Sequence, residues 1–385
     1  MPPRGQRRRV CYVTGSRAEF GFMRRTLEAI RQHDALTLQL LVTGMHLDPT
    51  RATTIDEISR RFGIDGVVPW DVGDGSSADA TRACGAAMRH FVDAFERLRP
   101  DIVLVAGDRI ETFSAAAAAS LDGRFVAHVH GGDRAAGQSD DSSRHAITKL
   151  SHLHLAATRD SARRIIRLGE EKWRVHVVGA PGLEGIRDEA AGRRDLALAG
   201  IDLPRHRFVL LVLHPTTEDI GRERDRARLL FAGVRDAFAG TVVVVFPNTD
   251  PGAKGIADAW EQLVVESNVV VFRHLPRALF LGLMRDAAAL VGNSSAGIIE
   301  AGSFGTPVLD LGERQQGRLA GGNVARRPLS RQAVARWLHR VMQNPVRARF
   351  RGRNVYHGRG VSRRVAELLA RVRVDADVRR KLISY

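Results

Sequence analysis

Short runs of apolar, β-branched residues alternate along the chain with longer stretches in which apolar residues recur every three or four positions. The first pattern is typical of strands buried on both faces, and the second is typical of amphipathic helices. Helices are predicted for residues 19–33, 81–98, 330–344 and 361–372. Strands are predicted for residues 10–15, 36–44, 101–108, 125–131, 153–158, 175–181, 207–215, 241–247, 269–275, 288–295 and 307–312.

The predicted strands fall into two sets, one on each side of about residue 180. Alternation of strands and helices indicates parallel sheets that are covered on both faces. We therefore expect an α/β protein with two doubly wound, Rossmann-like domains facing a cleft. The expected domains span residues 1–180 and 181–385, with the last helices closing the second domain. Ligands of such sheets bind beyond the carboxyl ends of the strands.

Composition supports a soluble globular protein. Of 385 residues, 44% are hydrophobic and 26% are charged, which is enough apolar content for a buried core. No apolar run reaches the roughly 18 residues that span a membrane. The only cysteines, Cys11 and Cys84, have neither a disulfide pattern nor the spacing of a metal site. We expect a cytoplasmic protein without a metal, a cofactor or a membrane partner.

The net charge of +16 raises the possibility of nucleic-acid binding. The arginines are not clustered, however, and recur at helical spacing in stretches such as RDRARLL and SRQAVARWLHR. That spacing is typical of solvated helix faces, and aromatic residues, at 6%, offer no stacking platform. The sequence therefore argues against a nucleic-acid partner, while a broad positive field could still steer a small anionic substrate.

Two strand-to-helix turns have residues suited to a phosphate. Arg17 lies at the predicted start of a helix in TGSRAEFG. Ser294 and Ser295 lie at the predicted start of another helix, in VGNSSAGIIEAGSFGTPVLDLG. Free backbone N–H groups and hydroxyls at such turns bind anions, and Glu300 could accept from ribose hydroxyls. Plain helix capping by serine explains part of the same pattern. The chain has neither a P-loop nor a GxGxxG motif, which disfavours an NTPase or a dehydrogenase.

Two further strand ends carry polar residues. His214 ends the strand in LHPTTED, and Asn248 and Lys254 follow another in FPNTDPGAKG. A lone histidine at a strand end is more often structural than catalytic, and turn chemistry alone explains asparagine, aspartate, proline and glycine. These residues are candidates only in combination with the other motifs.

Carboxylates gather at two neighbouring strand ends. Asp108 lies beside Arg109 in AGDRIET, and Asp133, Asp140 and Asp141 lie in HGGDRAAGQSDDSSRH. Neighbouring carboxylates raise one another's pKa, which provides a group that exchanges protons near neutral pH. Caps and turns are the alternative explanation for the Asp140–Asp141 pair. Four carboxylates in one place favour acid/base chemistry.

Together these stretches resemble the hydrolysing UDP-N-acetylglucosamine 2-epimerases, including the bacterial enzymes that open sialic-acid and legionaminic-acid pathways. The resemblance runs from about Arg9 to Val324 and is densest in DDSSRHAITKLSHLHLAAT, LPRALFLGLMRDAAALVGNSSAGIIEAGSFGTPV and GERQQGRLAGGNV. It implies a glycosyltransferase-B type fold, usually a homodimer or homotetramer, and a nucleotide-sugar substrate. It also implies substrate contacts at Arg17, Arg109, His214, Asn248, Lys254, Leu275, Ser294, Ser295, Glu300 and Arg314. The catalytic residues that it implies are Asp108, His130, Asp133, Asp140, Asp141, Arg144 and His214, with His145 completing the motif.

One stretch departs from the family. Several members read Glu-Gly-Gly-Glu where this chain has residues 130–133, His-Gly-Gly-Asp; other members already have His at the first position but commonly keep Glu at the fourth. Ala135-Ala136 also replaces residues that are often polar. The departure leaves open which group handles the sugar's C2 proton and which substituents the sugar carries.

The family's reaction removes the C2 proton as UDP leaves, giving a glycal that is then hydrated and reprotonated from the opposite face. The sequence leaves other functions open. The protein could be a non-hydrolysing epimerase, a glycosyltransferase or divergent nucleotide-sugar hydrolase of the same fold, or a non-catalytic nucleotide-sugar sensor.

Overall fold

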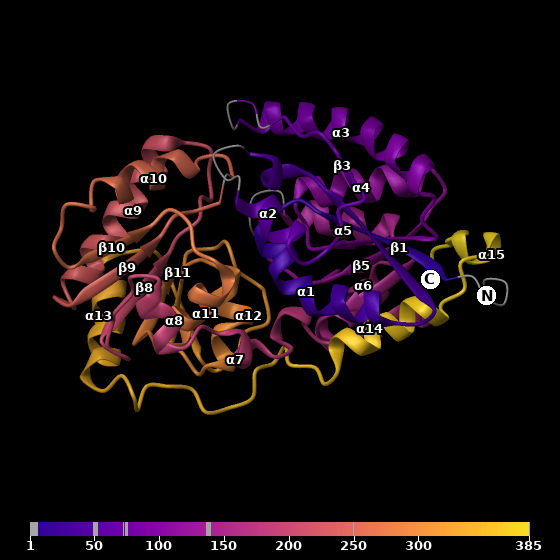
Figure 1. Cartoon of the computed structure of the whole chain (residues 1–385). Coiled ribbons are helices and arrows are strands. Elements are labelled where there is room, and N and C mark those ends of the chain that lie inside the picture. Colours follow the sequence, from indigo (N-terminus) through magenta and orange to yellow (C-terminus); the bar gives the residue numbers. More distant parts are fainter. Residues whose placement is uncertain are drawn as a thin grey trace. The chain divides into compact units, whose positions relative to one another are not determined.

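The computed structural model describes residues 7–48, 53–71, 73, 76–135, 140–248 and 250–384, which form two parallel sheets (Figure 1). Every strand that the sequence predicts is present, although most are shorter at their ends. Two edge strands were not predicted, β3 (Gly66–Val67) and β13 (Val324–Arg327). Their side chains are partly or fully exposed, so they leave no apolar run in the sequence.

The first sheet has the strand order β3-β2-β1-β4-β5-β6-β7. Between β1 and β4 the direction of winding reverses, so that the loops after these two strands flank the switch point where doubly wound sheets bind ligands. The remaining strands of the sheet are β1 (Arg8–Thr14), β2 (Leu36–Val42), β4 (Ile102–Ala106), β5 (Phe125–Val129), β6 (Leu153–Ala156) and β7 (Val175–Val177). The helices that connect them include α1 (Arg17–Gln32), α2 (Thr53–Ser59), α3 (Ser77–Leu98), α4 (Ile110–Leu121), α5 (Asp140–Leu150) and α6 (Arg159–Arg167).

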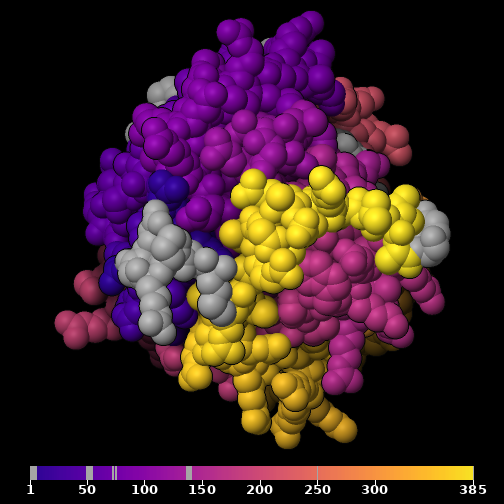
Figure 2. Space-filling model, turned by 90° about the vertical axis from the view of Figure 1, so that its right-hand side faces the viewer, coloured from indigo at the N-terminus to yellow at the C-terminus, as the bar shows by residue number. Residues whose placement is uncertain are grey.

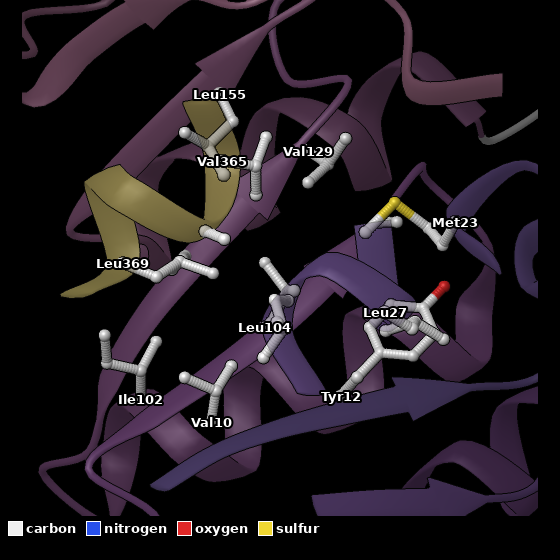
Figure 3. Close-up of a cluster of buried hydrophobic side chains, with 14 of the residues drawn as sticks. Val10, Tyr12, Met23, Leu27, Ile102, Leu104, Val129, Leu155, Val365 and Leu369 are labelled. Carbon is white, nitrogen blue, oxygen red and sulfur yellow. The ribbon is translucent and has the colours of Figure 1, made fainter. Parts of the chain in front are cut away.

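Side chains alternate between the two faces of this sheet. On one face Tyr12 of β1 packs in a cluster with Met23 and Leu27 of α1 (Figure 3). On the other face, Cys11 packs in a cluster with Phe91 of α3 and with alanines of α4. Because a strand directs successive side chains to opposite faces, helices on both sides bury every residue of β1 except Arg9. This double covering explains the near-continuous apolar run in the sequence.

The second sheet repeats the arrangement with the order β10-β9-β8-β11-β12-β13, and its switch point lies between β8 and β11. Its other strands are β8 (Phe208–Val212), β9 (Thr241–Val245), β10 (Val269–Phe272), β11 (Ala289–Gly292) and β12 (Val308–Leu311). The helices with this sheet are α7 (Ile186–Glu189), α8 (Arg193–Leu198), α9 (Ile220–Arg235), α10 (Ala253–Glu261), α11 (Arg277–Asp286), α12 (Ser295–Ile299) and α13 (Arg331–Gln343).

The end of the chain returns to the first sheet. Helix α14 (Val361–Arg371) buries Val365 and Leu369 in the cluster that contains Val10 and Leu104 (Figure 3). After α15 (Ala376–Arg379), the yellow end of the chain lies against the magenta part of the same unit (Figure 2), where the Arg174 guanidinium donates to the Val378 carbonyl at 2.8 Å. The sequence predicts that these last helices close the second domain, whereas they pack on the first sheet. Their apolar stripe is visible in the sequence, but a stripe does not say which sheet it covers.

Contacts accordingly divide the chain into two compact units. The first unit comprises residues 1–133, 139–184 and 356–385, and the second comprises residues 134–138 and 185–355. The passage between sheets falls near Glu184, a few residues beyond the expected position. Among the helices of the described residues, none combines the length and apolarity that a membrane span requires.

Candidate active site

The loops after β1 and β4 are tied together by a buried carboxyl group. The side chain of Glu19, in the first turn of α1, accepts from the Gly15 backbone N–H at 3.0 Å and from the Thr112 hydroxyl at 2.6 Å. Burial, followed by the charge of nearby Glu111, raises the pKa of Glu19 to about 7. This network fixes the two loops that flank the first switch point.

Arg17 and Arg109, the two arginines predicted to contact the nucleotide, start from these loops. The Arg109 guanidinium donates to Glu111 at 3.2 and 3.3 Å. Arg17 is 4.0 Å from Glu57. The side chain of Arg109 is 21% exposed and that of Arg17 is 17% exposed, so both are largely buried beside carboxylates.

A third arginine gathers the carboxylates of the first unit. Arg144 of α5 is 1% exposed; its guanidinium contacts Asp108 directly and donates to Asp141 at 2.8 Å. It also donates to the backbone carbonyl of Asp133 at 2.9 Å. The predicted convergence of strand ends is therefore present, with a guanidinium between Asp108 and Asp141. The side chains of Asp108 and Asp141 are 23% and 33% exposed, so both remain partly accessible to solvent.

The other members of the carboxylate stretch have different partners. His145 lies 3.4 Å from Asp141, and burial lowers its pKa. The Asp133 carboxylate lies 3.3 Å from His130 and accepts from the Ser161 hydroxyl at 2.6 Å. The side chain of Asp140 and the whole of Ala136 lie outside the described residues.

At the second switch point, Asn293 links the ends of β8 and β11. Its side-chain oxygen accepts from the backbone N–H of His214 at 2.7 Å, and its amide donates to the carbonyl of His214 at 2.8 Å. The His214 ring in turn accepts from the Asn248 backbone N–H at 3.4 Å, through Nδ1. Gly292 has a φ of +149°, and a Cβ there would lie 1.9 Å from the Val212 carbonyl oxygen. Only glycine allows the two strand ends to approach so closely.

Ser294 and Ser295 directly follow Asn293 in the chain. Ser294 caps α12 and accepts from the Ala296 backbone N–H at 3.3 Å. Because α12 has only five residues, its dipole would contribute little to binding an anion. The groups that could bind an anion here are the serine hydroxyls and the backbone N–H groups. The guanidinium of Arg314 joins this group through the Asn293 carbonyl at 3.4 Å and is 14% exposed. His214, Asn248, Ser294 and Arg314 are thus brought together as predicted.

Three predicted substrate contacts lie apart from that group or are already engaged. Glu300 pairs with Arg277 at 2.5 Å, and its side chain is 12% exposed. Lys254 is 72% exposed and pairs with Asp258 one helical turn along α10. Leu275 packs at the edge of the apolar cluster that contains Leu210 and Leu290.

Sequence reasoning missed the residues that support these groups. Asn293 could have been noticed because it directly follows a buried strand, and Glu19 and Glu111 because they lie in the first turns of the helices that follow β1 and β4. Ser161 gave no signal, because it is a serine at an ordinary helix start. Arg277 looked like one more solvated arginine, although its side chain is 13% exposed. Within the described ranges, no group of three or more metal-ligating side chains has a metal-binding arrangement.

Known proteins share this architecture and sequence. The family described as UDP-N-acetylglucosamine 2-epimerase matches residues 28–370. A relative from Legionella pneumophila, named UDP-N,N'-diacetylbacillosamine 2-epimerase (hydrolyzing), is 34% identical over 384 residues, which cover 98% of this chain and all of the relative. A GDP/UDP-N,N'-diacetylbacillosamine 2-epimerase (hydrolyzing) from Campylobacter jejuni is 30% identical over 83% of this chain and 84% of its own length.

A solved structure agrees with the fold. The crystal structure of a UDP-GlcNAc 2-epimerase from Neisseria meningitidis, bound to UDP-GlcNAc, superposes with a TM-score of 0.78. It is 21% identical, and the match covers 94% of this chain and 99% of that one. The resemblance inferred from the motifs is confirmed, and the chain belongs to the UDP-N-acetylglucosamine 2-epimerase family.

Proposed function

We propose that the protein is a hydrolysing 2-epimerase that acts on a UDP-linked N-acetylated amino sugar and yields UDP and the free sugar inverted at C2. UDP-N-acetylglucosamine would give N-acetylmannosamine. The observation that carries the proposal is the set of accessible carboxylates on Arg144 at the carboxyl end of the first sheet. Membership of the epimerase family supports it.

The reaction demands two kinds of chemistry. The C2 proton is not adjacent to a carbonyl, so a base alone cannot remove it easily. The negative charge that develops on the departing UDP must be stabilised as the proton leaves. The first unit offers acid/base groups in Asp108 and Asp141, and the arginine-serine motifs offer cations and hydrogen-bond donors for the diphosphate.

We assign these roles to the predicted residues. The proposed acid/base and supporting residues are Asp108, His130, Asp133, Asp140, Asp141, Arg144 and His214. The proposed contacts to the nucleotide sugar are Arg17, Arg109, His214, Asn248, Lys254, Leu275, Ser294, Ser295, Glu300 and Arg314. Among the latter, His214 and Arg314 have the firmest support, because Asn293 holds both at the second switch point.

A sugar with a second acetamido group is the alternative substrate. The Legionella relative that matches almost the whole chain is named for UDP-N,N'-diacetylbacillosamine. The match over almost the whole of both chains is the observation that favours this alternative.

UDP release in the absence of an acceptor tests the proposal. The assay uses purified protein with UDP-N-acetylglucosamine, its diacetamido analogue and their GDP-linked counterparts, in deuterium oxide and heavy-oxygen water. We expect UDP release, deuterium at C2 and, at early times, heavy oxygen at C1 of the free sugar.

Each rival has a different signature in that assay. A glycosyltransferase or a sensor releases no UDP without an acceptor. Deuterium in epimerised UDP-sugar without net UDP release identifies a non-hydrolysing epimerase. UDP release without deuterium at C2 identifies simple hydrolysis. Any of these three results would overturn the proposal.

We also propose that the protein works in the cytoplasm as a homodimer or homotetramer, with a nucleotide sugar as its small-molecule partner. Both cysteines, Cys11 and Cys84, are free and buried, which fits a reducing compartment. Cell fractionation and sedimentation equilibrium test the location and the oligomeric state. A periplasmic pool, or a monomer at micromolar concentration, would contradict this part of the proposal.

A further inference from the structure

A chain of polar side chains runs from the end of β5 to the start of α6. The Ser161 hydroxyl donates to one oxygen of Asp133 at 2.6 Å, and His130 Nδ1 lies 3.3 Å from the other oxygen. Ser161 is itself fixed, because its hydroxyl lies 2.7 Å from the hydroxyl of Thr158, the residue that caps α6. The four residues form one continuous network, which we call the His130 network.

Asp133 is poorly placed to touch a substrate. Its side chain is 3% exposed, and each carboxylate oxygen already has a hydrogen-bonding neighbour. The backbone on both sides is also held, since Arg144 donates to the Asp133 carbonyl and Arg164 contacts the Gly132 carbonyl. A Cβ on Gly132 would lie 2.3 Å from the Ser161 carbonyl oxygen, so the loop presses tightly against α6.

His130 is the more accessible member of the pair. Its side chain is 11% exposed, and its ring makes an edge contact with Phe22, with 5.4 Å between ring centroids. Its φ of +64° is unusual for a residue other than glycine, and such strain clusters at functional sites. An ionised aspartate can only accept, so a neutral His130 ring donates from Nδ1 and keeps the lone pair on Nε2.

We propose that His130 is the catalytic residue that takes the C2 proton, and that Asp133 and Ser161 are positioning residues acting through it. The proposal rests on the proposed function. In the step, the C2 proton moves to His130 Nε2, and the C2–H electron pair becomes the C1=C2 double bond of the glycal. The C1–O bond breaks and its electron pair leaves on the β-phosphate oxygen of UDP. The carboxylates that Arg144 contacts, those of Asp108 and Asp141, return a proton to the opposite face of C2.

The arrangement follows the logic by which a buried carboxylate orients a histidine base. It also gives a physical role to the shortened side chain at position 133. The Asp133 carboxylate contacts both Ser161 and His130, and the imidazole ring is the more exposed group of the pair. A glutamate there would carry its carboxylate one methylene further.

Replacing residues of the network tests the proposal. We expect His130→Asn, in which asparagine tolerates the positive φ, to lower kcat and C2 deuterium exchange about 100-fold or more, with unchanged KM and UDP affinity. Asp133→Asn should lower kcat about tenfold to 100-fold, and Ser161→Ala several-fold, with Ser161→Thr restoring the rate. The double variant His130→Asn/Asp133→Asn should be no slower than His130→Asn alone. His90→Gln, at a half-exposed position on α3, is the matched control and should leave turnover unchanged.

A second readout does not depend on activity. Nitrogen NMR of the ring should find the His130 proton on Nδ1 in the unaltered protein and shared between both nitrogens in Asp133→Asn, with His130→Asn identifying the signal. If the unaltered protein releases no UDP, the proposed function fails while the tautomer measurement still tests the network.

Two results would overturn the inference. If Asp133→Asn abolishes turnover while His130→Asn stays near normal, Asp133 is itself the base. If the His130 tautomer is the same with and without the Asp133 carboxylate, Asp133 does not position the ring. Circular dichroism of each variant separates these results from loss of folding.

Discussion

At the scale of single residues, Arg144 determines how the proposed acid/base groups are arranged. Its buried guanidinium contacts Asp108 from the loop after β4 and Asp141 from its own helix, and it donates to the backbone after β5. The burial of this charge is compensated by two carboxylates and a backbone carbonyl that accept from the guanidinium. The side chains of Asp108 and Asp141 stay partly exposed, at 23% and 33%.

Asp108→Asn should separate catalysis from nucleotide binding. The amide keeps the size of the side chain but removes its charge and its ability to exchange a proton. We expect kcat to fall by about 100-fold or more, while calorimetry finds UDP affinity unchanged. Asp93→Asn, at a side chain 77% exposed on α3, is the control. Near-normal turnover in Asp108→Asn would make Asp108 a structural residue.

Glu19 predicts a pH dependence of stability. Its folded pKa of about 7 lies above the ordinary value of 4.5, so the folded state retains a proton that the unfolded chain loses. The contribution of Glu19 to the free energy of unfolding therefore falls as the pH rises from about 4.5 to about 7, and is constant above that range. Urea unfolding should show a drop of a few kcal/mol at most in that window, and Glu19→Gln should flatten it. If the free energy of unfolding depends on pH in the same way in the unaltered protein and in Glu19→Gln, the raised pKa of Glu19 is contradicted.

At the scale of elements, the strands and the polar residues at their ends could be predicted from sequence, whereas the partners of those residues could not. The apolar run of β8 located His214 at a carboxyl end, and parallel topology then placed it beside the end of β11. The role of Asn293, which joins the two strand ends, could not be predicted, because it depends on the close approach that Gly292 allows. The Asp133–Ser161 contact joins residues 28 positions apart, and no local pattern encodes it.

The strand-to-helix turn after β11 carries its own prediction. Ser294→Ala with Ser295→Ala removes two hydroxyls from the proposed diphosphate contacts but leaves the backbone N–H groups. We expect UDP binding to weaken by about 1–3 kcal/mol, the order of one lost charge-assisted hydrogen bond. Isothermal titration calorimetry measures the change, and Ser330→Ala, at the cap of α13, controls for capping alone. Unchanged UDP affinity would remove both serines from the site.

At the scale of the whole molecule, the chain passes from the first unit to the second and back again. Sequence order placed α14 in the second domain, but its buried residues belong to the core of the first sheet. Arg8 at the start of β1 donates to the carbonyl of Leu369 at 2.5 Å, so the two ends of the chain stabilise the same unit. Because the pairing joins residues 361 positions apart, amphipathicity alone could not reveal it.

Leu369→Ala should therefore weaken the first unit, although Leu369 follows the second unit in sequence. Leu369 is 0% exposed, so its truncation costs about 2–5 kcal/mol of unfolding free energy. Hydrogen exchange should accelerate at the amides of β1 and β4 and not in the second sheet. Leu338→Ala, equally buried in α13, should do the reverse, and Leu382→Ala, at a side chain 81% exposed, should alter neither. Faster exchange in β8 and β11 on replacing Leu369 would show that α14 stabilises the second sheet after all.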